Sequence, residues 1–137
     1  MKKLFFVTLI SFLFLSACSS QQGYSSAYEA ISSIEGDVTP TDSSSNMNLE
    51  GIQPSSYQLP NGEIISVYEF ASTEERDAGK KHFDESTQLL SSHAPIVYQA
   101  GNYLVFYYSR VDSNFRTPEI NETTYGAKIE KALNSIE

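Results

Sequence analysis

The sequence predicts a small α+β protein, in which a four-stranded antiparallel sheet carries helices on one face. Two pairs of β-type segments are each joined by a short turn, and a helical segment follows each pair. The length of 137 residues suits one domain, or one domain with a tether. The predicted order is therefore β-β-α-β-β-α, a two-layer sandwich preceded by a short N-terminal helix.

The first hairpin is predicted at "SYQLPNGEIISVYEF", residues 56–70, where Asn61-Gly62 is the strongest short turn signal in the chain. In its second strand Ile65 and Val67 point to one face of the sheet, and Ser66 and Tyr68 point to the other. The more aliphatic face, with Ile65 and Val67, is expected to face the core.

A helix is predicted over residues 72–92. Ser72 and Glu75 form a capping-box pattern at its start. Gly79 falls in its middle, where glycine costs about 1 kcal/mol of helix stability relative to alanine.

The second hairpin is predicted from "PIVYQ" and "YLVFYYS", at residues 95–99 and 103–109, with Gly101 and Asn102 in the turn. The second of these strands is apolar on both faces, which favours a central position with cover on each side. The last helix follows in 121–137, with Ile129, Leu133 and Ile136 as its buried stripe.

The segment before the first hairpin divides into two parts. Residues 24–35 place Tyr24, Ala27, Tyr28, Ile31 and Ile34 at spacings of three and four, which predicts a short helix or a transient helix within a linker. Residues 36–56 are rich in Ser, Asp, Asn, Pro and Gly and predict a long polar loop. We therefore assign residues 24–56 to this helix and loop and residues 57–137 to the α+β domain.

The N-terminus has the pattern of a secretory signal in residues 1–17. Lys2 and Lys3 precede an apolar run from Leu4 to Leu15, and the small residues Ser16 and Ala17 follow. The run is shorter than the roughly 20 residues that a membrane-spanning helix needs. We therefore expect this segment to be removed rather than to remain as a transmembrane helix.

Leu15-Ser16-Ala17-Cys18 ends the signal and contains the only cysteine of the chain. This motif resembles the lipobox of bacterial lipoproteins. The resemblance implies that Cys18 carries a diacylglycerol thioether after cleavage and is the first mature residue, followed by a tether over residues 18–23. It also implies an outward-facing protein held to the cell membrane by its acyl chains, as two chains suffice for stable anchoring. The alternative is an ordinary signal peptide with a chance cysteine at its end.

The chain is acidic, with 17 Asp and Glu against 9 Lys and Arg and a formal net charge of −8. Removal of the signal would take two of the lysines away. Such a surface repels nucleic acid and anionic headgroups, so we expect no nucleic-acid partner. The ordinary consequence of this charge is solubility, and attraction of cations is the alternative.

No catalytic pattern stands out in the sequence. The serines form neither a G-x-S-x-G nor an S-x-x-K motif, and no glycine-rich phosphate loop or dinucleotide fingerprint occurs. His82 and His93 lack the spacing of a zinc site. We expect no enzyme activity, no cofactor and no metal centre.

The unusual feature is the aromatic content, with nine Tyr and no Trp. Tyr57 and the four predicted partner-binding residues are expected to share the sheet face opposite the helices, where tyrosine suits recognition. The alternative is that these rings only pack, or that the N-terminal helix folds back onto them. The leading functional hypothesis is a binding module for an envelope protein or small ligand. One alternative is an accessory or sensor subunit in which loop 36–56 orders on binding. Two further alternatives are a cation-binding lipoprotein and a signalling role for the released signal fragment. The four predicted binding residues are Tyr68, Tyr98, Tyr103 and Tyr107.

Overall fold

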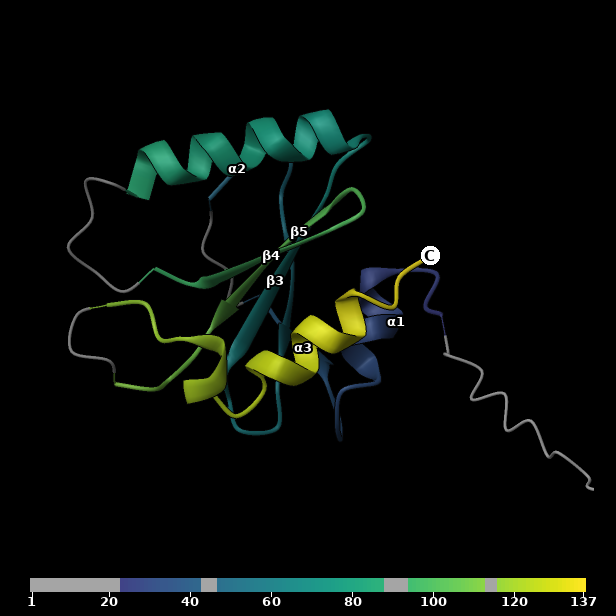
Figure 1. The fold of residues 1–137 in the computed structure, drawn as a ribbon, viewed down its shortest axis with the longest axis vertical. Coiled ribbons are helices and arrows are strands. Elements are labelled where there is room, and N and C mark those ends of the chain that lie inside the picture. The colour runs from purple at the N-terminus through teal and green to yellow at the C-terminus, as the bar shows by residue number, and fades with distance from the viewer. Residues whose placement is uncertain (1–22, 43–46, 88–93, 113–115) are drawn as a thin grey trace, which may run out of the picture.

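Five antiparallel strands form one sheet in the computed structural model, which describes residues 23–42, 47–87, 94–112 and 116–137 (Figure 1). The α+β class expected from the sequence is confirmed. The order across the sheet is β1-β2-β3-β5-β4, so the last strand lies between the two strands that precede it in the chain. The strands are β1 (Thr39–Pro40), β2 (Ser55–Gln58), β3 (Ile64–Glu69), β4 (Ile96–Ala100) and β5 (Tyr103–Tyr108).

Both predicted hairpins are confirmed. Strands β2 and β3 pair with Tyr57 opposite Ile65, and strands β4 and β5 pair with Ala100 opposite Tyr103. Each turn contains a glycine in the left-handed region, Gly62 at φ 83° and Gly101 at φ 53°, where a side chain would be strained.

The prediction of four strands is wrong, because the segment expected to be a loop adds a fifth. Strand β1 pairs with the outer edge of β2, with Thr39 opposite Gln58. The Thr41 amide continues this pairing by donating to the Ser56 carbonyl oxygen at 2.9 Å. The sequence carries no pattern that predicts β1, since two residues are too few to show the alternation of a strand.

The prediction of helices on one face is also wrong. Helices α1 (Ala27–Ser32) and α3 (Gly126–Leu133) lie on one side of the sheet, and α2 (Thr73–Thr87) lies on the other (Figure 1). A 3₁₀ turn, η1 (Ile120–Glu122), comes before α3. The physical reason lies in β5, whose side chains are apolar on both faces and need cover on both.

Two apolar cores result, one on each face of the sheet. The core under α1 and α3 contains Ile65 and Val67, as expected, and continues into both helices. Helix α1 contributes Ala27, Ala30 and Ile31 to it, so residues 24–35 are part of the fold and the alternative of a transient linker helix is wrong. The core under α2 consists of Leu49, Tyr68, Phe70, Phe83, Leu104 and Phe106.

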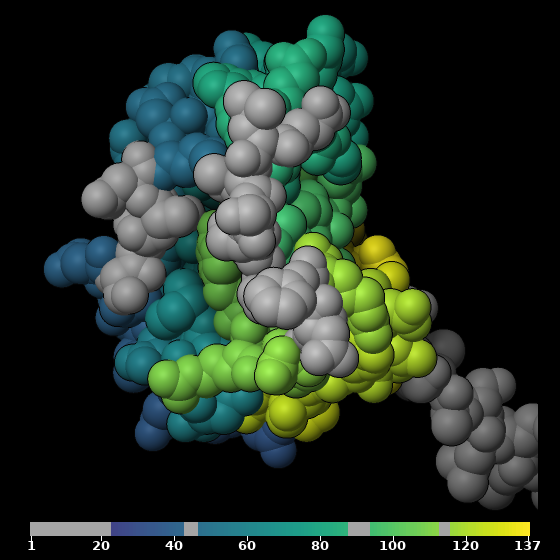
Figure 2. Space-filling view, turned by 90° about the vertical axis from the view of Figure 1, so that its left-hand side faces the viewer, coloured from purple at the N-terminus to yellow at the C-terminus, as the bar shows by residue number. Residues whose placement is uncertain are grey.

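Part of the expected polar loop also folds onto this second core. Leu49 is fully buried, and the Tyr68 hydroxyl donates to the Met47 carbonyl oxygen at 2.9 Å. Leu49 and Ile52 exchange two backbone hydrogen bonds around a tight turn. Figure 2 shows this blue segment beside the teal helix α2.

The two ends of the described domain lie together. The Tyr24 amide donates to the Ser135 carbonyl oxygen at 2.8 Å, and the Glu137 amide donates to the Tyr24 carbonyl oxygen at 3.1 Å. In Figure 1 the C-terminus accordingly lies next to α1. The chain that precedes Tyr24 therefore leaves the domain close to α1.

Candidate binding groove

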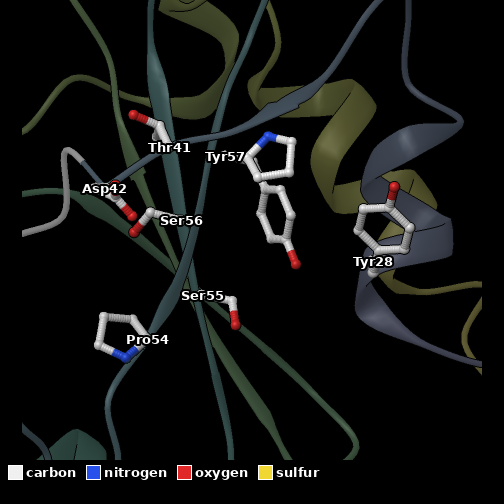
Figure 3. Close-up of a pocket in the computed structure, with 8 residues that line it drawn as sticks. Tyr28, Thr41, Asp42, Pro54, Ser55, Ser56 and Tyr57 are labelled. Atoms are coloured by element: carbon white, nitrogen blue, oxygen red, sulfur yellow. The ribbon is translucent and has the colours of Figure 1, made fainter.

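A groove of about 760 Å³ lies where α1 meets the outer edge of the sheet. Two tyrosines line it, Tyr28 from α1 and Tyr57 from β2, and Figure 3 shows their rings side by side with the hydroxyls pointing in opposite directions. We call this the tyrosine groove. Its remaining lining is two prolines, three hydroxyl side chains and one carboxylate: Pro40, Pro54, Thr41, Ser55, Ser56 and Asp42.

Local sequence explains why Tyr28 is exposed. The Ser26 side chain caps α1 by accepting from the Glu29 amide at 3.2 Å, which fixes the start of the helix. With this start, Ala27, Ala30 and Ile31 face the core. Tyr28 then falls at the margin of the buried face, and its side chain is 51% exposed, the one large hydrophobic residue so exposed in the described parts of the chain.

Tyr28 and Tyr57 form an aromatic pair across the groove. Their ring centroids are 5.4 Å apart and the ring planes are inclined by 40°. Tyr57 lies opposite Pro40 in the β1–β2 pairing, which places the proline ring on the same face of the sheet. The sheet therefore supports the pair on the Tyr57 side, and Tyr28 is its half-exposed member.

The groove continues past this pair into a second hollow of about 260 Å³. The second hollow shares Tyr28, Ser55 and Tyr57 with the first, and it adds Glu69 from β3 and Tyr103 from β5. Glu69 lies opposite Tyr103 in the sheet, and the Tyr103 hydroxyl donates to its carboxylate at 3.5 Å. A carboxylate thus lines each part of the groove, Asp42 in the first and Glu69 in the second.

Of the four tyrosines predicted to bind a partner, only Tyr103 reaches this groove. Tyr68 and Tyr107 are fully buried, and Tyr98 is 7% exposed. The prediction of an open aromatic sheet face is therefore wrong. The alternative drawn from the sequence, that the N-terminal helix folds back onto the sheet, is what the structure contains.

The four predicted binding residues do not include Tyr28, which the sequence places in the apolar stripe of the N-terminal helix. They also do not include Tyr57, although the sequence places it on the same candidate sheet face as those four. Only the tertiary structure separates Tyr28 and Tyr57 from the buried tyrosines, because their exposure depends on how much of the sheet the six-residue helix α1 covers.

A buried carboxylate lies apart from the groove, beside the β2–β3 turn. Glu63 is 3% exposed and accepts hydrogen bonds from the Tyr107 hydroxyl, the Ser109 hydroxyl at 3.3 Å and the Arg110 amide at 3.0 Å. Burial raises the pKa of Glu63, but these bonds and one involving Asn61 outweigh burial and leave the pKa below its ordinary value. Burial, with the nearby Glu63, raises the pKa of Tyr107. The Glu63 carboxylate and the Tyr107 hydroxyl are hydrogen-bonded to each other, so we assign them to the stability of the fold rather than to a binding site.

The histidines form no metal centre in the described part of the chain. His82 lies on α2 with its Nδ1 3.0 Å from the Glu50 carboxylate, and His93 lies outside the described residues. Within residues 23–42, 47–87, 94–112 and 116–137, no group of three or more His, Cys, Asp and Glu side chains has the geometry to hold an ion.

The signal, the lipobox and Cys18 lie outside the described residues, so the predicted acylation stays a prediction. Among the helices that are described, none combines the length and apolar character needed to span a bilayer.

Fold and site together define a class: a small α+β domain with helices on both faces of an antiparallel sheet and an aromatic, acidic groove at one sheet edge. No protein-family model, curated protein or solved structure matches the chain.

Proposed function

We propose that this protein is an outward-facing lipoprotein that binds an envelope partner or ligand in the tyrosine groove and catalyses no reaction. The observation that carries the proposal is the half-exposed Tyr28 ring, paired with Tyr57 at the centre of the groove. A tyrosine that is apolar on its face and polar at its tip is a frequent anchor of binding sites.

A single exposed aromatic residue on a protein surface needs no explanation by itself. Three features set Tyr28 apart. It stands beside a second tyrosine, it lines a groove, and the groove walls carry hydroxyl groups and carboxylates that can orient a ligand. A concave site with a few polar groups is the usual form of a binding site.

The proposed anchor places this groove near the membrane. Six peptide units separate Cys18 from Tyr24, and they span about 20 Å at most. Tyr24 lies three residues before the start of α1 at Ala27, and α1 carries Tyr28. A protein anchored at Cys18 would hold its groove close to the outer surface of the bilayer, where an envelope partner is accessible.

The side chains that line the groove do not favour catalysis. Its lining in the described chain consists of tyrosines, prolines, aliphatic side chains, hydroxyls, an amide and carboxylates, without a histidine, lysine or arginine to act as an acid, base or activator. The buried carboxylate Glu63 and the Tyr107 hydroxyl bonded to it line neither hollow.

An accessory or sensor subunit is the second candidate, with the loop 36–56 ordering on binding. The burial of Leu49 and the bond from Tyr68 to Met47 speak against it, because part of that loop is packed without a partner. A cation-binding role is the third, and calorimetric titration with zinc, copper and calcium tests it directly.

The test of the groove is site-specific photocrosslinking in the native cells. A photoreactive phenylalanine analogue replaces Tyr28 in the full-length chain, and a control chain carries it at Glu85, an exposed position of α2 on the other side of the sheet. We expect a discrete adduct from position 28 and none from position 85, and the position-28 adduct should weaken when Tyr57→Ala is added. Equal labelling from both positions, or none from position 28, would contradict the proposal.

A further inference from the structure

We propose that the tyrosine groove binds an extended peptide segment of a protein partner that carries arginine or lysine. This inference rests on the proposed function, because it names the ligand of the same site. Its supports are the charge of the groove, the exposed aromatic face, the spacing of the two carboxylates and the open shape of the groove.

The charge of the groove favours a cation. Asp42 lines the first hollow and Glu69 lines the second, and both residues are exposed. No lysine or arginine lines either hollow among the described residues. The chain as a whole carries 17 acidic against 9 basic residues, so the long-range field attracts a cationic ligand as well.

The aromatic pair suits a cation that is flat. The Tyr28 ring lines both hollows, each of which also has a carboxylate in its lining, and it is half exposed and paired with Tyr57. A guanidinium group stacks on such a face and bonds a carboxylate with two parallel hydrogen bonds, whereas an ammonium group makes only a point contact. Arginine should therefore bind more tightly than lysine.

The sheet register sets the spacing of the two carboxylates. The Thr41 amide bonds to the Ser56 carbonyl, and Asp42 is the next residue after this bond; Ser55, the neighbour of Ser56, lies opposite Val67. Glu69 is two residues beyond Val67 on β3. Two strand spacings and about two residues of rise separate the two backbone positions by roughly 12 Å, or three to four residues of extended peptide.

The shape of the groove favours an extended chain over a small molecule. The groove runs across the ends of β1 and β2 in two joined, open hollows rather than as one enclosed cavity. A small-molecule site normally encloses most of its ligand. Aromatic side chains along an open groove are a typical surface for extended peptide recognition.

The experiment is isothermal titration calorimetry with the mature acylated chain, which begins at Cys18, in detergent micelles. The probe is the peptide acetyl-Gly-Arg-Pro-Ser-Arg-Gly-amide, whose two arginines are three residues apart. Its matched control replaces both arginines with citrulline, which keeps the shape and removes the charge. A third titrant, triacetylchitotriose, represents a glycan.

We expect the arginine peptide to bind at least tenfold more tightly than the citrulline peptide, with an affinity that falls as salt rises. Tyr28→Ala should weaken binding at least tenfold, and Asp42→Asn and Glu69→Gln severalfold each. Glu85→Gln, which removes a carboxylate from the far side of the sheet, should leave binding unchanged. Because all four side chains are exposed, these variants should fold, and circular dichroism checks that they do.

The outcomes separate the two proposals. If both peptides bind equally and Tyr28→Ala weakens both, the groove is a binding site but the cationic class is wrong. If the chitotriose binds through Tyr28 and the peptides do not, the partner is a glycan and the inference is overturned. If nothing binds while position 28 still crosslinks in cells, the inference falls and the proposed function stands.

Discussion

Glu63 is the buried acid in the described part of the chain, and its surroundings decide its charge. A carboxylate taken out of water normally becomes harder to ionise, because the charged form loses hydration. Here the donors from Tyr107, Ser109 and the Arg110 amide replace that hydration, and the pKa of Glu63 lies below its ordinary value. The ionised carboxylate therefore joins the β2–β3 turn to the end of β5.

Glu63→Gln should lower the free energy of unfolding by about 1–3 kcal/mol at pH 7, because it removes charge-assisted bonds from a buried site. Since the folded pKa is depressed, the stabilisation by Glu63 is complete above the unfolded pKa, about 4.3, and is lost as the pH falls through the folded pKa. The difference between wild type and variant should thus shrink below about pH 4.

Urea unfolding at pH 7, 5, 4 and 3 measures this difference. The matched control is Glu130→Gln on the exposed face of α3, which should change the free energy of unfolding by less than about 0.5 kcal/mol. A difference between Glu63→Gln and wild type that stays constant over this pH range would contradict the argument.

At the scale of elements, the contact between α2 and the sheet depends on a glycine. Sequence reasoning treats Gly79 as a weak point of the helix, but the structure buries it against the Phe70 ring. A Cβ at position 79 would lie 2.5 Å from the Phe70 Cζ. Glycine at position 79 therefore lowers the helix propensity of α2 but allows α2 to pack closely against the sheet.

Gly79→Ala should destabilise the protein by about 1–3 kcal/mol through this clash, although alanine is the better helix former. In the double variant Gly79→Ala with Phe70→Leu, the smaller side chain at position 70 leaves space for the new Cβ. The double variant should recover part of the lost stability, so that the two substitutions couple favourably. Thermal unfolding of the two single variants and the double variant measures the coupling. Stabilisation by Gly79→Ala alone would show that α2 is free to move outward.

At the scale of the whole molecule, acidic charge is the dominant electrostatic feature. The formal net charge is −8, and removal of the signal lysines would make it more negative. Most ion pairs in the described residues join exposed or half-exposed side chains, such as Lys80 with Asp84 at 2.5 Å. Exposed pairs of this kind contribute little, so the self-repulsion of the surface should outweigh them.

Raising NaCl from 20 to 500 mM should therefore increase the melting temperature by a few degrees, because salt screens the repulsion. Calorimetric scans at several salt concentrations measure the slope. The double variant Glu130→Lys with Glu137→Lys, which changes two exposed residues, should show a smaller slope. A melting temperature that falls with salt would mean that the ion pairs dominate.

Local sequence is enough to predict both hairpins with their Asn61-Gly62 and Gly101 turns, the helices, and the central position of β5. These follow from side-chain period and turn chemistry, which act over a few residues. Only the tertiary structure decided that a two-residue strand extends the sheet, that helices cover both faces, and that Tyr28 rather than Tyr107 is exposed. Such features depend on contacts between segments far apart in the chain, and the hydrophobic pattern of one segment does not record which other segment covers it.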